Sequence, residues 1–89
     1  SGQRKLMRNR PNPVFDETTI GFELPEGCDA RLRILDAMGR VVAERKATYS
    51  TGYHEERFQV GNMHSQGVLY YELTTPYGSL SSKMVVVKR

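Results

Sequence analysis

The side chains of this sequence that could do chemistry are few and widely spaced. Two histidines, His54 and His64, could bind a metal ion, but nothing near them supplies the third and fourth ligands that a zinc site requires. Cys28 is the only cysteine, and no histidine with an asparagine or aspartate flanks it to make a thiolate nucleophile. We therefore expect both histidines at the surface and Cys28 as a small packed or half-exposed residue.

Carboxylates and hydroxyls offer no catalytic arrangement either. Glu55 and Glu56 are adjacent, and neighbouring residues of a strand point to opposite faces, so the two cannot act on one substrate. The aspartates at positions 16, 29 and 36 lack the alternating acidic spacing of a calcium loop. The serines at positions 50, 65, 79, 81 and 82 have neither a strained elbow nor a neighbouring base. We predict a non-enzyme without cofactor or metal, whose activity is recognition.

Composition predicts one small domain. The chain has 89 residues, of which 38% are hydrophobic and 26% charged, and it contains no tryptophan, so its core is thin. Ser1-Gly2 is typical of a scar left by an expression tag, which makes residues 3–89 the domain. The net charge of +3 reflects basic residues near the start, but no nucleic-acid-binding signature occurs, so we expect no nucleic-acid partner. No apolar run approaches the ~20 residues of a membrane span.

The elements that carry these residues are strands. Apolar and polar residues alternate with a period of two in several segments, and turn residues separate the segments. The expected strands are residues 4–8, 18–24, 30–34, 40–46 and 54–60, and the two strands on either side of a turn at 75–78. About seven short strands without a helical period indicate an all-β fold, an immunoglobulin-like antiparallel β-sandwich with Greek-key connections. A five-stranded barrel is the alternative, which the strand count disfavours.

The connections have their own signals. Two prolines at Asn9–Pro13 predict a rigid crossing between the two sheets, because proline lacks the backbone donor that pairing needs. Asp36–Gly39 and Thr75–Gly78 match type I turns. Residues 47–52 are expected to form a polar connection, and residues 61–67 an irregular turn from which Met63 plugs the core. Tyr71 enters its strand where a sandwich often anchors a tyrosine hydroxyl to backbone.

The last strand, Lys83–Lys88, is apolar on both faces. One face, either Met84 with Val86 or Val85 with Val87, is expected in the core, while the other meets a partner or a neighbouring sheet edge. Flanking lysines around an exposed apolar strand suit docking by strand addition with charge contacts.

Taken together, these segments resemble a known family over almost the whole chain, from Leu6 to Lys88. The matching pieces are Asn9-x-Pro11-Asn12-Pro13, Thr19-Ile20-x-Phe22-x-Leu24-Pro25, Leu32-x-Ile34-x-Asp36-x-x-Gly39-Arg40-Val41-Val42, Gly67-Val68-x-Tyr70-Tyr71-x-Leu73 and Lys83-Met84-Val85-Val86-Val87-Lys88. In this order they resemble the C-terminal sorting domain, type A, of the bacterial type IX secretion system.

The resemblance implies the role of an address tag behind an N-terminal passenger. Similar proteins pass through the periplasm, are bound by the outer-membrane translocon and its shuttle components, and reach the cell surface or the medium. A sortase-like cysteine peptidase commonly removes the domain. The implied recognition residues are Pro11, Asn12, Pro13, Gly39, Gly67, Lys83, Val85, Val86, Val87 and Lys88. For Gly39 and Gly67, a purely structural role in turns is the competing interpretation.

Two further possibilities stay open at this stage. The domain could form a homodimer through a free strand edge. It could alternatively be an immunoglobulin-like accessory or adhesive module that binds sugar or spaces other domains. Tyr49, Tyr53 and Tyr77 gathered on one face would favour sugar stacking.

Overall fold

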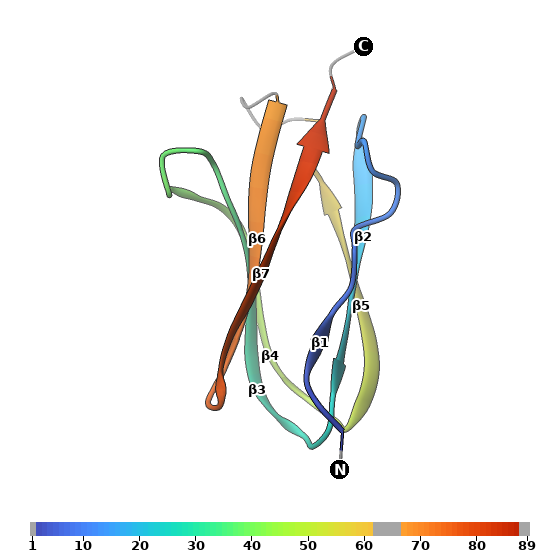
Figure 1. Cartoon of the computed structure of the whole chain (residues 1–89), viewed down its shortest axis with the longest axis vertical. Coiled ribbons are helices and arrows are strands. Elements are labelled where there is room, and N and C mark those ends of the chain that lie inside the picture. Colours follow the sequence, from blue (N-terminus) through green and yellow to red (C-terminus); the bar gives the residue numbers. More distant parts are fainter. Residues whose placement is uncertain (1, 62–66, 88–89) are drawn as a thin grey trace.

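The computed structural model describes residues 2–61 and 67–87, which form seven β-strands and no helix, so they include no helix that could cross a membrane. The strands are β1 (Lys5–Leu6), β2 (Glu17–Leu24), β3 (Cys28–Leu35), β4 (Val41–Tyr49), β5 (Gly52–Gln59), β6 (Gly67–Thr75) and β7 (Gly78–Val86). They form two antiparallel sheets, ordered β1-β2-β5 and β4-β3-β6-β7, which pack as a sandwich (Figure 1). The predicted all-β sandwich is confirmed.

The chain passes between the sheets at three connections. These are β2 to β3, β4 to β5, and β5 to β6. Strand β3 pairs with β4 on one side and with β6 on the other, so the chain returns to the far side of β3 after visiting the opposite sheet. This return is the Greek-key arrangement expected from the sequence.

The core fills the space between the sheets with the inward residues of each alternating strand. In β2, Thr18, Ile20, Phe22 and Leu24 are buried, as the alternation predicts. The buried hydrophobic residues are Val14, Ile20, Phe22, Leu24, Ala30, Leu32, Ile34, Tyr49, Phe58, Val60, Leu69, Tyr71, Leu73, Met84 and Val86. Each fully buried aliphatic or aromatic side chain stabilises the fold by roughly 1.5–3 kcal/mol before entropy is counted.

Both predicted tight turns are present. In the β3–β4 turn the amide of Gly39 donates to the carbonyl of Asp36 at 2.9 Å, and Gly39 has a φ of 84°, which favours glycine. In the β6–β7 hairpin Thr75 pairs with Gly78, and the Thr75 hydroxyl accepts a hydrogen bond from the Tyr77 amide at 3.1 Å. Met63, expected to plug the core, lies outside the described residues.

The prediction of a polar connection over residues 47–52 is wrong. Strand β4 continues to Tyr49, because β3 begins at Cys28 and pairs with β4 as far as Tyr49. The Tyr49 ring is buried and meets the Phe22 ring edge-on, with centroids 5.0 Å apart. The strand therefore continues past its polar residues and ends with Tyr49, whose ring packs in the core. Strand β1 is also shorter than the expected residues 4–8.

Arg45 covers the side of the sandwich between the edge strands β4 and β5. Its guanidinium lies 4.5 Å from the Phe58 ring centroid and donates to the carbonyl of Arg57 at 3.0 Å. This arginine therefore shields a core aromatic ring and satisfies an edge carbonyl of β5.

Candidate recognition surface

The segment Asn9–Val14 joins the two sheets and carries three of the predicted recognition residues. It leaves β1, pairs with β2 through Arg10 and Thr19, and then reaches β7, where Val14 forms a parallel bridge with Val86. The peptide bonds before Pro11 and Pro13 are both cis. The segment thus crosses between the sheets as predicted, although Arg10 also pairs.

Backbone groups of β7 are bonded by this segment. The side-chain oxygen of Asn12 accepts a hydrogen bond from the Val85 amide at 3.1 Å, and the Val14 amide donates to the Val85 carbonyl at 2.7 Å. The Val87 amide donates to the Val14 carbonyl at 2.8 Å. Strand addition at Val85 and Val87, expected from the sequence, therefore finds that edge already filled.

Of the three predicted residues in this segment, Asn12 makes the contact with β7. Pro11 and Pro13 are exposed, whereas Asn12 is half-buried. Proline has no backbone donor, so the two prolines leave the loop with fewer amide groups that need partners.

The outward face of β7 is exposed and its inward face is core. Met84 and Val86 are 0% and 5% exposed, whereas Val85 and Val87 are 39% and 37% exposed. The structure therefore assigns Met84 with Val86 to the core, one of the two options that the sequence left open. Lys83 points to the same exposed side as Val85. Lys88 lies outside the described residues.

The two predicted glycines serve the backbone. Gly39 and Gly67 have φ values of 84° and 98°, and a Cβ at either position would meet no atom within 4 Å. Each glycine is therefore needed for its backbone conformation rather than for space. Gly39 lies in a turn that Asp36 organises, since the Asp36 carboxylate accepts hydrogen bonds from the Met38 and Arg40 amides, each at 2.9 Å.

The hydrogen bonds to Asp36 also change its acidity. Hydrogen bonds from the Arg40 amide and side chain and from the Met38 amide hold the pKa of Asp36 below its ordinary value, although burial of the carboxyl opposes this. The charged form of Asp36 therefore stabilises the β3–β4 turn.

A tyrosine anchor, predicted from the sequence, is present at Tyr71. Its buried hydroxyl donates to the Met7 carbonyl at 2.8 Å and accepts from the Asn9 amide at 3.1 Å. The side-chain amide of Asn9 donates to the Pro11 carbonyl and to the Thr18 hydroxyl. The sequence analysis did not predict Asn9 as a partner of Tyr71. The signal that could have indicated this role is the position of Asn9 at the start of the segment Asn9–Val14.

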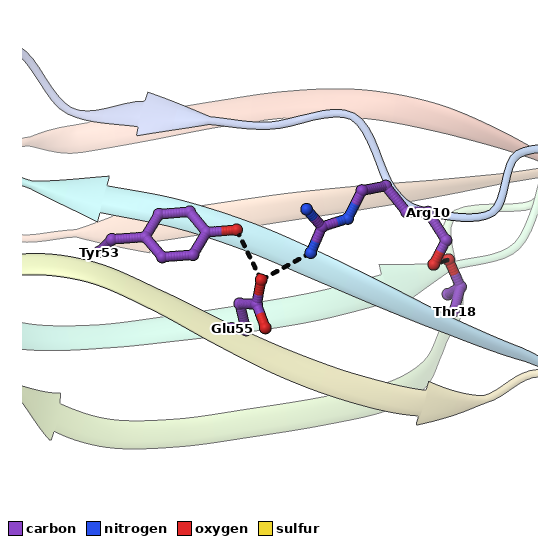
Figure 2. Close-up of polar contacts among 4 residues, drawn as sticks. All are labelled: Arg10, Thr18, Tyr53 and Glu55. Atoms are coloured by element: carbon purple, nitrogen blue, oxygen red, sulfur yellow. Dashed lines mark hydrogen bonds and ion pairs between the residues drawn. The ribbon is translucent and has the colours of Figure 1, made fainter.

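A second polar cluster, also missed, lies on the outer face of the three-stranded sheet. Figure 2 shows the Glu55 carboxylate between the Arg10 guanidinium at 2.6 Å and the Tyr53 hydroxyl at 2.9 Å. The hydrogen bond from Arg10, followed by that from Tyr53, holds the pKa of Glu55 below its ordinary value. From the inward face of β2, the buried Thr18 hydroxyl donates to the Arg10 carbonyl at 3.2 Å. The Arg10–Glu55 ion pair therefore holds the start of the segment Asn9–Val14 against β5.

Tyr53 in this cluster explains why glycine is at position 21. A Cβ at Gly21 would lie 2.2 Å from the Tyr53 hydroxyl oxygen, so the ring lies directly over that backbone. Tyr53 is thus engaged on the outer face of the sheet, while Tyr49 is in the core. The three tyrosines named for sugar stacking are not gathered on one exposed face.

Among residues 2–61 and 67–87, no group of three or more histidine, cysteine or acidic side chains could hold a metal ion. Cys28 is half-buried, as expected. A surface pocket with a volume of about 300 Å³ is lined by Asp29, Arg31, Lys46 and the β6–β7 turn.

The fold places the chain among immunoglobulin-like β-sandwich domains. The chain belongs to the family of secretion system C-terminal sorting domains, whose model matches residues 10–88. The resemblance inferred from the sequence is therefore confirmed, and the domain is a C-terminal sorting signal of type IX secretion.

Comparison of structures adds information about the fold. The sandwich is similar to part of the crystal structure of an engineered protein, with a TM-score of 0.53 and 14% identity over 98% of this chain. The chain spans 20% of the length of that protein. No curated protein matches the sequence.

Proposed function

We propose that this domain directs an N-terminal passenger through the type IX outer-membrane translocon and is then removed by a sortase-like cysteine peptidase. Membership of the sorting-domain family implies contact with the type IX machinery, attachment to a passenger, and export to the cell surface or the extracellular space. The proposal adds three steps to this role: periplasmic transit, recognition by the translocon and its shuttle components, and removal of the domain. The proposal also takes residues 3–89 as a single sorting domain.

The exposed side of β7 is the observation that carries the proposal. Lys83, Val85 and Val87 lie on the outward face of a strand whose other face is core. Soluble domains seldom leave such apolar side chains together at the surface without use. We assign recognition to these three residues and to Lys88, which follows them in the sequence.

The other predicted residues support this strand from within. Val86 packs in the core, and Gly39 and Gly67 provide backbone conformations with positive φ. Asn12, held between Pro11 and Pro13, bonds the β7 edge. Val86 and Asn12 thereby hold the recognised strand in place, whereas Gly39 shapes the β3–β4 turn.

Removal of the domain by a peptidase fits the arrangement of β1. This strand contributes two residue pairs with β2, and the preceding Gly2 and Gln3 are exposed. Cleavage before β1 would therefore leave the sandwich intact while releasing the passenger.

The test is to fuse residues 3–89 to a periplasmic reporter in a host that has the translocon. We expect surface delivery with the intact domain, and periplasmic retention both in a host without the translocon and with Lys83→Glu/Val85→Ser. These surface substitutions are preferred to a deletion of residues 85–89, because the deletion also removes the core residue Val86. Delivery that is independent of the translocon would contradict the proposal. Full delivery of the folded double variant would contradict the assignment of recognition to the exposed side of β7.

Peptidase processing is tested in the same fusion. We expect a host without the sortase-like peptidase to export a reporter that still carries the domain, detected by its mass. Loss of the domain in that host would contradict this step alone.

Self-association through a strand edge is a separate proposal, with β4 as the candidate edge. Strand β4 is nine residues long and ends the order of its sheet, whereas Asn12 and Val14 bond part of the β7 edge. Sedimentation of the domain at increasing concentration tests for the dimer.

A further inference from the structure

Exposed apolar side chains gather at one end of the outer face of the four-stranded sheet. Val41, Val68, Tyr70, Val85 and Val87 are 46%, 36%, 44%, 39% and 37% exposed. They come from the start of β4, the start of β6 and the end of β7, with Val87 directly after β7. These parts of the strands lie together at the upper end of the sandwich in Figure 1, next to the β3–β4 turn.

The strand registers make these residues neighbours. Leu35, which is half-buried, pairs with Val41 on one side and with Tyr70 on the other. Val68 pairs with Val85 on the adjacent strands. Directly paired residues on one face of a sheet have Cβ atoms about 5 Å apart, so these side chains form a continuous surface. We call Leu35, Val41, Val68, Tyr70, Val85 and Val87 the apolar strip.

One cation borders the apolar strip on the edge strand β7. Lys83 is in register with Tyr70 and, among the described residues, forms no ion pair. The acidic side chains farther along the same face are engaged, since Glu72 bonds Arg33 at 2.5 Å and Glu44 lies 3.8 Å from Arg31. The strip therefore offers apolar contacts with a positive charge at its border.

The filled edge of β7 determines how a partner would approach. Because Asn12 and Val14 already bond the backbone of Val85 and Val87, a partner meets side chains here rather than a free strand edge. The contact is thus made with the face of the sheet, over four strands.

We propose that the apolar strip is the surface that a protein of the secretion machinery binds, through an apolar patch that carries a carboxylate for Lys83. This inference rests on the proposed function and extends the recognised surface from β7 to Leu35, Val41 and Tyr70. A second copy of the chain is disfavoured, because its strip offers no free carboxylate for Lys83: Glu44 and Glu72 on this face lie against Arg31 and Arg33.

The test compares export of the reporter fusion for Tyr70→Ser, Val41→Ser and Lys83→Glu. Tyr77→Ser is the matched control, because Tyr77 is an exposed tyrosine of the same hairpin at its opposite end. Lys83→Arg keeps the charge. We expect export to fall about tenfold or more in Tyr70→Ser, Val41→Ser and Lys83→Glu, and to persist in both Tyr77→Ser and Lys83→Arg. Thermal unfolding of each isolated domain shows whether the variants remain folded.

The outcomes separate this inference from the function that it extends. Export of the wild type together with full export of folded Tyr70→Ser and Val41→Ser would overturn the strip and leave the sorting function standing. Failure of the wild-type fusion would overturn the sorting function itself. Binding of the domain to phosphatidylglycerol vesicles that Tyr70→Ser abolishes would replace the protein partner by a membrane. A dimer in sedimentation that the same substitution disrupts would replace it by a second copy.

Discussion

At the scale of single residues, Tyr71 stabilises this fold through the hydrogen bonds of its hydroxyl as well as through the apolar contacts of its ring. Its ring is fully buried, yet its hydroxyl serves two backbone groups of the segment that leaves β1, the Met7 carbonyl and the Asn9 amide. These groups lie 64 and 62 positions away in sequence. Without the hydroxyl, both would lose their partner in a region that excludes water, which is costly.

We expect Tyr71→Phe to lower the free energy of unfolding by about 1–3 kcal/mol, because it leaves the Met7 carbonyl and the Asn9 amide unsatisfied. Tyr70→Phe is the matched control, since the Tyr70 ring is partly exposed on the next residue of the same strand. Urea denaturation of both variants measures the difference. Equal stability of the two variants would show that the anchor contributes nothing.

Asp36 gives a prediction about pH. Its pKa is lower in the folded chain than the ordinary value of 3.8, chiefly through the hydrogen bond from the Arg40 amide. A carboxyl with a depressed folded pKa stabilises the fold above its unfolded pKa, and this contribution is lost as the pH falls through the folded pKa.

We therefore expect Asp36→Asn to flatten the loss of stability on acidification below about pH 4. Arg40→Met is the control: it removes the guanidinium but keeps the amide that lowers the pKa most, so it should retain most of the pH dependence. Unfolding midpoints measured across this range test both variants. If Asp36→Asn loses stability on acidification as steeply as the wild type, Asp36 is not the source of this pH dependence.

At the scale of elements, the alternation of apolar residues was sufficient to predict most strands and their inward faces. The pattern in β2 and the Leu69-Tyr71-Leu73 face of β6 needed no tertiary information, because one face of each strand is simply buried. Strand β4 was predicted too short, because its exposed middle gave no sign that Tyr49 would return to the core.

Contacts between distant segments could not be predicted in the same way. Asn12 and Val85 are 73 positions apart, and nothing in their local patterns indicates that one bonds the other. The Arg10–Glu55 pair likewise depends on the register of β5 with β2. The sequence predicts recognition through β7, and this stays a prediction; the filled edge and the apolar strip could be found only from the fold.

The bond from Asn12 predicts a local change in the protection of β7. We expect Asn12→Ala to accelerate amide hydrogen exchange at Val85, whose amide loses its acceptor, and to lower stability by about 1 kcal/mol or less because this contact is exposed. The Val87 amide, which is bonded by the Val14 carbonyl, is the internal control. Exchange measured by NMR that is unchanged at Val85, or equally accelerated at Val87, would contradict a specific role for Asn12.

At the scale of the whole molecule, the two ends of the sandwich have different tasks. The sandwich is 42 Å long. In Figure 1 the chain approaches β1 from the lower end, where the β6–β7 turn also lies, whereas the β3–β4 turn and the end of β7 lie at the upper end. A passenger joined before β1 would therefore extend from the end opposite the apolar strip, and its size would not hinder a partner that binds there.

This separation predicts that insertions in two turns differ in effect. A flexible Gly/Ser peptide of about ten residues placed after Met38, in the β3–β4 turn, should block export by crowding the strip. The same peptide placed between Pro76 and Tyr77, in the β6–β7 turn, should be tolerated, because that turn lies at the other end of the molecule. Both are exposed turns, so thermal unfolding of the two isolated domains should show similar losses of stability. With similar stabilities, a difference in surface delivery of the reporter reflects the position of the insertion. If both insertions are exported equally well while folded, the partner does not bind at the upper end of the sandwich.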